Sequence, residues 1–235
     1  MQNKKIVISN AIICCILCVL GFFVSTINVS NTYLSVSAPL TNGDRKHSQI
    51  GLMFIIDEPE LANNLTNILD TLDKAEASAT FFFTGTSAIN NLELLQTLKQ
   101  KHEIGNYGFS NISLNLADKN LIYDEIRLGD ILIKSLTNIQ MKTFTPPTGS
   151  FNKHTIAMAS NLGYTTVLPT NRETMIDWAK ADSNLVLSYA TYNIQNGDII
   201  ALKPTVATMQ SFAQIIAHYT TNSWKITSLS RLLQL

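Results

Sequence analysis

The stretch IGLMFIIDEPELANNLTNILDTLDKAEASATFFFTG, residues 50–85, decides the fold class. It opens with an almost wholly apolar run over 50–56, which is typical of a strand covered on both faces in a parallel sheet. Leucine and isoleucine then recur at helical spacing between Leu61 and Leu72, and a second apolar run over 79–83 ends at Thr84 and Gly85. This order predicts a strand, a helix and a parallel strand.

The same alternation continues to the end of the chain. The pattern predicts further helices, in the segments 92–98, 121–136, 153–162 and 212–219, and further strands, at 103–105, 165–168, 199–202 and 226–229. Strands that alternate with helices at this spacing indicate an α/β protein with a parallel sheet, wound as a barrel or as an open layer. In either architecture the functional groups belong in the loops at the carboxyl ends of the strands.

The charge balance argues against nucleic acid as a partner. The 235 residues carry 17 Lys and Arg and 17 Asp and Glu, so the formal net charge at pH 7 is zero. No strong positive field is available to attract a polyanion. A hydrophobic content of 46% is enough for a substantial core in one main domain.

The N-terminus predicts a membrane anchor. Lys4 and Lys5 precede an apolar run over 6–24 that approaches the thickness of a bilayer core, and flanking lysines favour an N-inside orientation. We therefore expect residues 1–28 to form a single transmembrane helix or signal segment, residues 29–48 a linker, and residues 49–235 an extracytoplasmic domain attached to the cytoplasmic membrane.

Polar or turn-forming segments follow the predicted strands. They include DEP at 57–59, TG at 84–85, NYGFSN at 106–111, TPPTGSFN at 145–152, IDW at 176–178 and KPT at 203–205. In this order and spacing they make the chain similar to the polysaccharide deacetylase family, also called NodB-homology or carbohydrate esterase family 4. The resemblance runs from about residue 50 to residue 233. It implies an incomplete (β/α) barrel and ancestry among enzymes that remove acetyl groups from N-acetylated sugars of peptidoglycan or chitin-like polymers.

The resemblance also implies a metal site, and most of its residues are replaced here. The family uses a divalent metal such as zinc, held by one Asp and two His, with a second Asp as the base on the metal-bound water. The metal Asp matches Asp57, but the base matches Ile56 and the two His match Tyr107 and Asn111. A neutral phenol and a neutral amide are poor zinc ligands, so we expect no bound cofactor.

The remaining catalytic positions are replaced too. The Arg of the family's third loop matches Thr145, and the His that serves as acid matches Lys203, whose ammonium is a weak acid at neutral pH. No catalytic residue is therefore expected to be intact. The resemblance implies that Pro147, Asp177 and Trp178, together with Tyr107, line a substrate-binding rim.

These observations favour a catalytically inactive domain of the bacterial cell envelope that binds a glycan or regulates envelope assembly. Two alternatives stay open. The first is an active metal-dependent N-deacetylase whose site has been rebuilt, for instance from Asp57, His102 and Glu103. The second is a protein-interaction scaffold in envelope or spore-wall assembly, with an envelope protein instead of a glycan as its partner.

Overall fold

The computed structural model describes residues 38–170 and 176–235. The strands are, in chain order, β1 (Gln49–Ile56), β2 (Thr80–Phe83), β3 (Glu103–Asn106), β4 (Thr143–Phe144), β5 (Thr165–Thr166), β6 (Ile199–Leu202) and β7 (Lys225–Thr227). The α-helices are α2 (Leu65–Lys74), α3 (Gly85–Ile89), α4 (Leu92–Leu98), α5 (Lys119–Thr137), α6 (Lys153–Asn161), α7 (Ser183–Thr191), α8 (Val206–Thr221) and α9 (Leu229–Leu232). Two 3₁₀ helices, η1 (Pro59–Asn64) and η2 (Pro147–Gly149), follow β1 and β4.

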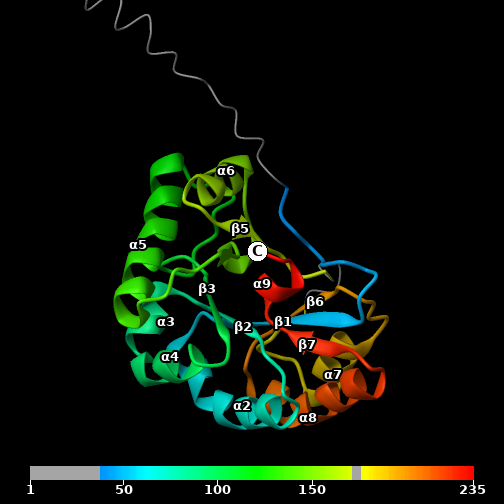
Figure 1. Ribbon diagram of the computed structural model, residues 1–235. Coiled ribbons are helices and arrows are strands. Elements are labelled where there is room, and N and C mark those ends of the chain that lie inside the picture. The colour runs from blue at the N-terminus through cyan, green and yellow to red at the C-terminus, as the bar shows by residue number, and fades with distance from the viewer. Residues whose placement is uncertain (1–37, 171–175) are drawn as a thin grey trace, which may run out of the picture. The chain divides into compact units, whose positions relative to one another are not determined.

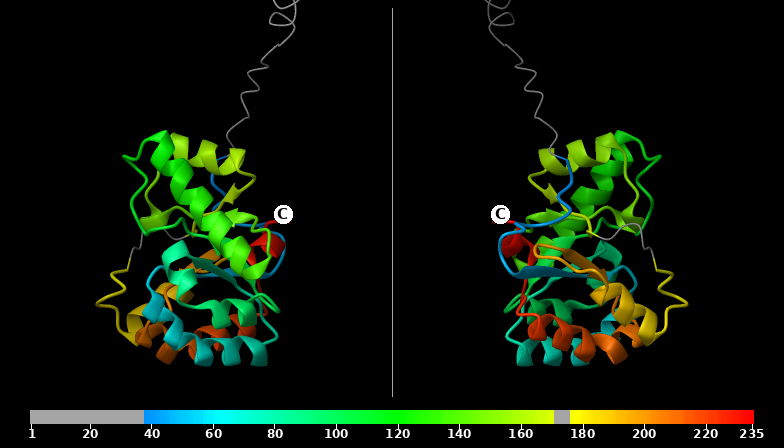
Figure 2. Two further views of the ribbon diagram at one scale, coloured as in Figure 1. Left: turned by 90° about the vertical axis from the view of Figure 1, so that its left-hand side faces the viewer. Right: turned by 90° about the vertical axis from the view of Figure 1, so that its right-hand side faces the viewer.

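The strands form one parallel sheet in the order β5-β4-β3-β2-β1-β6, and β7 also pairs with β1. The sheet curves, with α9 on its inner side and the longer helices around its outer side (Figure 1). The side views in Figure 2 show the same arrangement, with α5 and α6 at one end and α7 and α8 at the other. This is a parallel half-barrel. It confirms the α/β class predicted from the strand and helix pattern and the incomplete barrel that the resemblance implies.

The alternation of side chains along β1 separates two cores. Phe54 and Ile56 pack between the sheet and the outer helices, in the larger core. Met53 and Ile55 point to the inner side, where they pack with Tyr107, Val167, Ile199 and the leucines of α9. Because successive side chains of a strand face opposite sides, every second residue of β1 belongs to the barrel interior.

The open seam of the half-barrel, between β5 and β6, is bridged by residues 40–43. The Leu40 backbone N–H donates to the Thr166 carbonyl and its own carbonyl accepts from the Leu168 N–H, each at 2.9 Å. The Gly43 N–H donates to the Gly197 carbonyl at 2.7 Å. The second half of the predicted linker, from residue 40 onward, is therefore bonded to the sheet, whereas residues 1–37 lie outside the described residues and with them the predicted anchor.

No helix within residues 38–170 or 176–235 is long and apolar enough to cross a membrane.

Candidate functional site

Three strands deliver polar side chains to the carboxyl edge of the sheet. Asp57 directly follows β1, Tyr107 directly follows β3, and Lys203 directly follows β6. The register pairs Ile56 with Phe83 and Phe83 with Asn106, while Phe54 pairs with Leu202. The three strands thus end at nearly the same level, and residues distant in sequence meet there.

The Asp57 carboxylate is the centre of this edge. Its side chain is only 3% exposed, and its Oδ2 accepts hydrogen bonds from the Lys203 ammonium at 2.6 Å and from the Asn111 side-chain amide at 3.0 Å. Its Oδ1 is buried and has no hydrogen-bond partner among the described residues. Asn111 and Lys203 stand at two of the positions to which the resemblance assigns chemical roles. Both are bonded to Asp57, which stands at another.

Ile56, at the position of the family's base, cannot take part. The side chain is fully buried and packs in the core between the sheet and the outer helices, on the side of β1 opposite Met53 and Ile55. An isoleucine in this place has no proton acceptor.

Tyr107 lies in the barrel interior as a neutral phenol. The residue is 5% exposed, and its hydroxyl accepts a hydrogen bond from the Thr148 backbone N–H at 3.0 Å. Burial, and in second place the negative charge of Asp57, raises the pKa of the Tyr107 hydroxyl well above its ordinary value of 10. A phenol held in its protonated form is not a phenolate ligand for a metal.

The loop after β3 takes its shape from Glu125 on α5. The Glu125 carboxylate accepts from the Phe109 and Ser110 backbone N–H groups, at 3.0 and 2.8 Å, and from the Ser110 hydroxyl at 2.5 Å. Asn106 adds a second anchor, since its amide donates to the Ile126 carbonyl at 2.9 Å and its Oδ1 accepts from the Gly108 N–H at 2.8 Å. The backbone that carries Tyr107 and Asn111 is thus fixed by side chains that have no part in chemistry.

Two glycines allow α5 to approach this loop. Gly108 has φ +78°, a left-handed conformation that costs glycine little. A Cβ on Gly129 would lie 2.7 Å from the Gly108 carbonyl oxygen and 2.9 Å from Asn106 Oδ1, so any larger residue would push the helix away from the loop.

The loop after β4 contributes packing and hydrogen bonds to the site. Thr145 donates its hydroxyl to the Val167 carbonyl at 2.8 Å and is buried, so it acts as a sheet contact in place of the family's arginine. Pro147 is buried too, and its ring lies against Gly108, where an added Cβ would be 3.1 Å from Pro147 Cγ. The loop after β4 therefore lies against the loop after β3, where the Thr148 backbone N–H also donates to the Tyr107 hydroxyl.

Asp177 and Trp178 stand apart from that group. Asp177 is exposed, pairs with Lys180 at 3.0 Å and accepts from the Ala179 N–H. Trp178 packs edge-to-face on Tyr189 of α7, with ring centroids 5.8 Å apart. Among the described residues, neither is joined to Asp57 by a hydrogen bond or an ion pair. Their role in a substrate-binding rim stays a prediction.

The structure contradicts a rebuilt metal site made of Asp57, His102 and Glu103. Glu103 begins β3, at the opposite end from Tyr107, and its carboxylate accepts from the hydroxyls of Thr80, Thr143 and Ser230. The His102 ring packs on Phe81 and accepts from the Ala79 N–H. The three residues do not converge, because a strand separates the two ends at which they lie.

The family's divalent metal does not fit the residues present. One unpartnered carboxylate oxygen, Asp57 Oδ1, is all that remains of the donor set, and a lysine ammonium already balances the charge of that carboxylate. In the described part of the chain, no three His, Cys, Asp or Glu residues are grouped as a metal would need. Zinc in proteins takes at least three such ligands.

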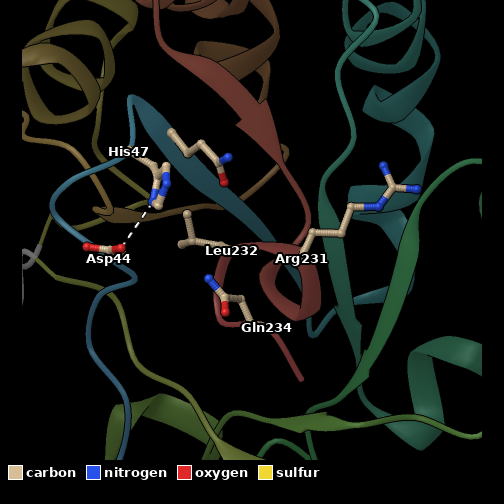
Figure 3. Close-up of a pocket in the computed structure, with 6 residues that line it drawn as sticks. Asp44, His47, Arg231, Leu232 and Gln234 are labelled. Carbon is tan, nitrogen blue, oxygen red and sulfur yellow. Dashed lines mark hydrogen bonds and ion pairs between the residues drawn. The ribbon is translucent and has the colours of Figure 1, made fainter.

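A polar cavity lies at the other end of the barrel, near the start of β1. It has a volume of about 130 Å³ and is lined by Asp44, His47, Gln49, Arg231, Leu232 and Gln234. Figure 3 shows His47 directed at Asp44, to which it is bonded at 3.0 Å, while Arg231 extends away from both. The paired groups are exposed. This cavity is roughly 25 Å from Asp57 along an eight-residue strand, at the end of a barrel that ordinarily serves stability.

Fold and site together define a parallel half-barrel of the deacetylase type. Residues 43–167, more than half of the chain, match the polysaccharide deacetylase family. The chain belongs to this family.

Curated relatives agree with the family. The chain is 28% identical to the YlxY protein of Bacillus subtilis over 170 residues, which cover 72% of this chain and 53% of YlxY. It is 27% identical to a peptidoglycan-N-acetylglucosamine deacetylase of Bacillus cereus over 172 residues, which cover 71% of this chain and 80% of that protein. The chain thus spans about half the length of YlxY.

Solved structures show the same fold. A carbohydrate esterase family 4 pseudoenzyme from Bacillus anthracis superposes with a TM-score of 0.77 at 24% identity, covering 83% of this chain and 68% of that one. The peptidoglycan N-acetylglucosamine deacetylase Bc1960 superposes with a TM-score of 0.76 at 20% identity, covering 86% and 96%.

Sequence reasoning missed two functional contacts. It assigned Lys203 only the role of a poor acid, although the structure makes it the partner of Asp57. It did not single out Glu125. The sequence does contain a signal for this residue, because Glu125 is an acidic residue on the buried, mostly apolar face of α5, between Ile122 and Gly129. A buried carboxylate needs hydrogen-bond donors, and here the loop after β3 supplies them.

Proposed function

We propose that this protein is a polysaccharide deacetylase-type domain that binds envelope glycan without hydrolysing it. The observation that carries the proposal is the pair of hydrogen bonds by which Lys203 and Asn111 occupy Asp57 Oδ2. Hydrolysis in this family needs a metal-bound water and a base, and here the ligand positions hold Tyr107 and Asn111 and the base position holds Ile56.

Glycan as the ligand is supported by the family. Several relatives are named as peptidoglycan deacetylases, which act on cell-wall glycans. The backbone of the strand-end loops is still held in place here, by Glu125 and Asn106 in the loop after β3. A domain that keeps the shape of its strand-end loops but lacks the family's catalytic and metal-binding residues can still bind a glycan.

We further propose that the domain works outside the cytoplasm, attached to the cytoplasmic membrane by residues 1–28. The lysine flank and the apolar run of that segment support this placement.

Metal content and acetate release test the proposed inactivity. The purified protein, dialysed after exposure to zinc, is expected to retain far less than one zinc per chain by elemental analysis. It is expected to release no acetate from N-acetylated chitooligosaccharides or peptidoglycan, under conditions in which the Bacillus cereus peptidoglycan deacetylase does. Stoichiometric zinc together with metal-dependent acetate release, lost in Asp57→Ala, would falsify the proposal and restore the active-enzyme alternative.

A sedimentation assay with purified peptidoglycan tests the binding. The protein is expected to sediment with peptidoglycan and to be displaced by soluble chitooligosaccharide. If it stays in the supernatant but is recovered with one envelope protein, the scaffold alternative replaces glycan binding.

A further inference from the structure

We infer that the side chain of Lys203 takes the place of a divalent metal, and that its ammonium binds the acyl carbonyl oxygen of a bound N-acetylated sugar. The inference rests on the proposed glycan binding and assigns the residue that recognises the acyl group. It concerns a lysine that directly follows β6, at the carboxyl edge of the sheet.

The first step is the charge of Asp57. A carboxylate that is 3% exposed loses most of its hydration, and without a nearby cation the ionised form is costly. The Lys203 ammonium, at 2.6 Å, is its one ion-pair partner among the described residues. Lysine thereby supplies the positive charge that an ion would otherwise supply, with no requirement for metal.

The second step is the number of donors. A lysine ammonium has three N–H groups, and in the described part of the chain one of them is used, in the bond to Asp57. The Lys203 side chain is 22% exposed, whereas that of Asp57 is 3% exposed. The lysine is therefore the member of the pair that a ligand can reach.

The third step is the chemical class of the ligand. Asp57 and Lys203 together are neutral, and the exposed Glu58 and Glu60 follow Asp57 at the same edge. This balance disfavours an anion, since acidic groups would repel it. A neutral carbonyl oxygen accepts from an ammonium without that repulsion. An acetamido group offers such an oxygen.

Two neutral oligosaccharides of equal length distinguish acyl recognition from general sugar binding. Chitotetraose carries an acetamido group on each ring and cellotetraose carries none. By calorimetry in EDTA, the protein is expected to bind chitotetraose roughly tenfold or more tightly than cellotetraose, the range of one charge-assisted hydrogen bond. Lys203→Met is expected to remove most of this preference while leaving cellotetraose binding unchanged.

Controls separate the charge from the fold. Lys225→Met makes the same substitution at an exposed lysine that begins β7, and is expected to keep the full preference. Lys203→Met leaves Asp57 without its cation and is expected to lower the Tm by several degrees. The double variant Asp57→Asn/Lys203→Met, which has no unpaired charge, is expected to recover at least half of that loss and still lack the preference.

The outcomes bear on different claims. Binding of neither sugar by the wild-type protein would overturn the proposed glycan binding, and with it this inference. Equal binding of both sugars, or a preference that survives in Lys203→Met and in the double variant, would overturn the role of Lys203 and leave glycan binding in place. A preference that is measured without EDTA but is absent in EDTA would assign the recognition to a metal instead of the lysine.

Discussion

At the scale of single residues, the replaced positions of the site compensate one another. Taken separately, the resemblance predicts Asn111 as a replaced metal ligand and Lys203 as a poor acid. Together they satisfy one oxygen of a carboxylate that would otherwise be buried and charged without a partner. The sequence shows each replacement, but the mutual bonds appear only when the ends of β1 and β6 and the loop after β3 are placed side by side.

Glu125 offers a test of how the loop after β3 is held. Glu125→Ala removes the acceptor of two backbone N–H groups and one hydroxyl, and we expect the free energy of unfolding to fall by about 2–3 kcal/mol. The measurement is urea denaturation followed by circular dichroism.

Asp124→Ala is the matched control, because Asp124 is an exposed acid on the same helix. Its effect should stay within about 0.5 kcal/mol, as for most surface substitutions. Equal stabilities of the two variants would mean that Glu125 does not anchor the loop.

At the scale of elements, the strands with strong patterns were predicted closely. The strand expected over 199–202 is β6, and those expected at 50–56 and 79–83 are β1 and β2 with ends that shift by one residue. β4, α3 and α7 were not predicted. A strand of two residues has no measurable period, and it exists because β3 and β5 pair with it on either side.

The short helix α9 is the element whose role depends most on tertiary structure. It fills the barrel interior, and a Cβ on Gly51 would lie 2.8 Å from the Cδ2 atoms of Leu229 and Leu232. The Ser230 backbone and hydroxyl also donate to Glu103, each at 2.8 Å. The helix α9 is therefore hydrogen-bonded to the sheet and packed against it near the starts of β1 and β3.

Shortening a side chain of α9 that lies in the barrel interior should lower the stability of the protein. Leu229→Ala removes a fully buried side chain, and we expect a loss of about 2–4 kcal/mol in the free energy of unfolding. Leu235→Ala, at a residue that is 38% exposed, should cost less than about 1 kcal/mol. If chemical denaturation gave the two variants the same midpoint, α9 would not be part of the cooperative core.

At the scale of the whole molecule, the segment over 40–43 joins the two edges of the half-barrel before the chain enters β1. Asn42 bridges to Asp198, and Arg45 forms an ion pair with the same aspartate. The segment that precedes β1 is thus bonded to the rest of the domain. Residues 40–43, which fall within the predicted linker 29–48, are bonded to the sheet and to the loop before β6.

The proposed anchor predicts how the protein fractionates. We expect the full chain to sediment with membranes and to resist extraction by alkaline carbonate, and the variant that lacks residues 1–28 to remain in the supernatant, because the apolar run is its means of insertion. Added protease should digest the domain in intact protoplasts if it faces outward. Release of the full chain by carbonate, or protection from protease, would rule out this placement.

The sequence by itself determined the α/β class, because buried strands, amphipathic helices and turn residues are local patterns that repeat along the chain. The family and its incomplete barrel were implied by the resemblance of the segments that follow the strands. The resemblance also predicts which residues of this chain stand at the family's metal and catalytic positions. Only the tertiary structure decided what the replacements do: Asp57, Asn111 and Lys203 are up to 146 residues apart, and their charges and hydrogen bonds balance only because parallel strands end at one edge.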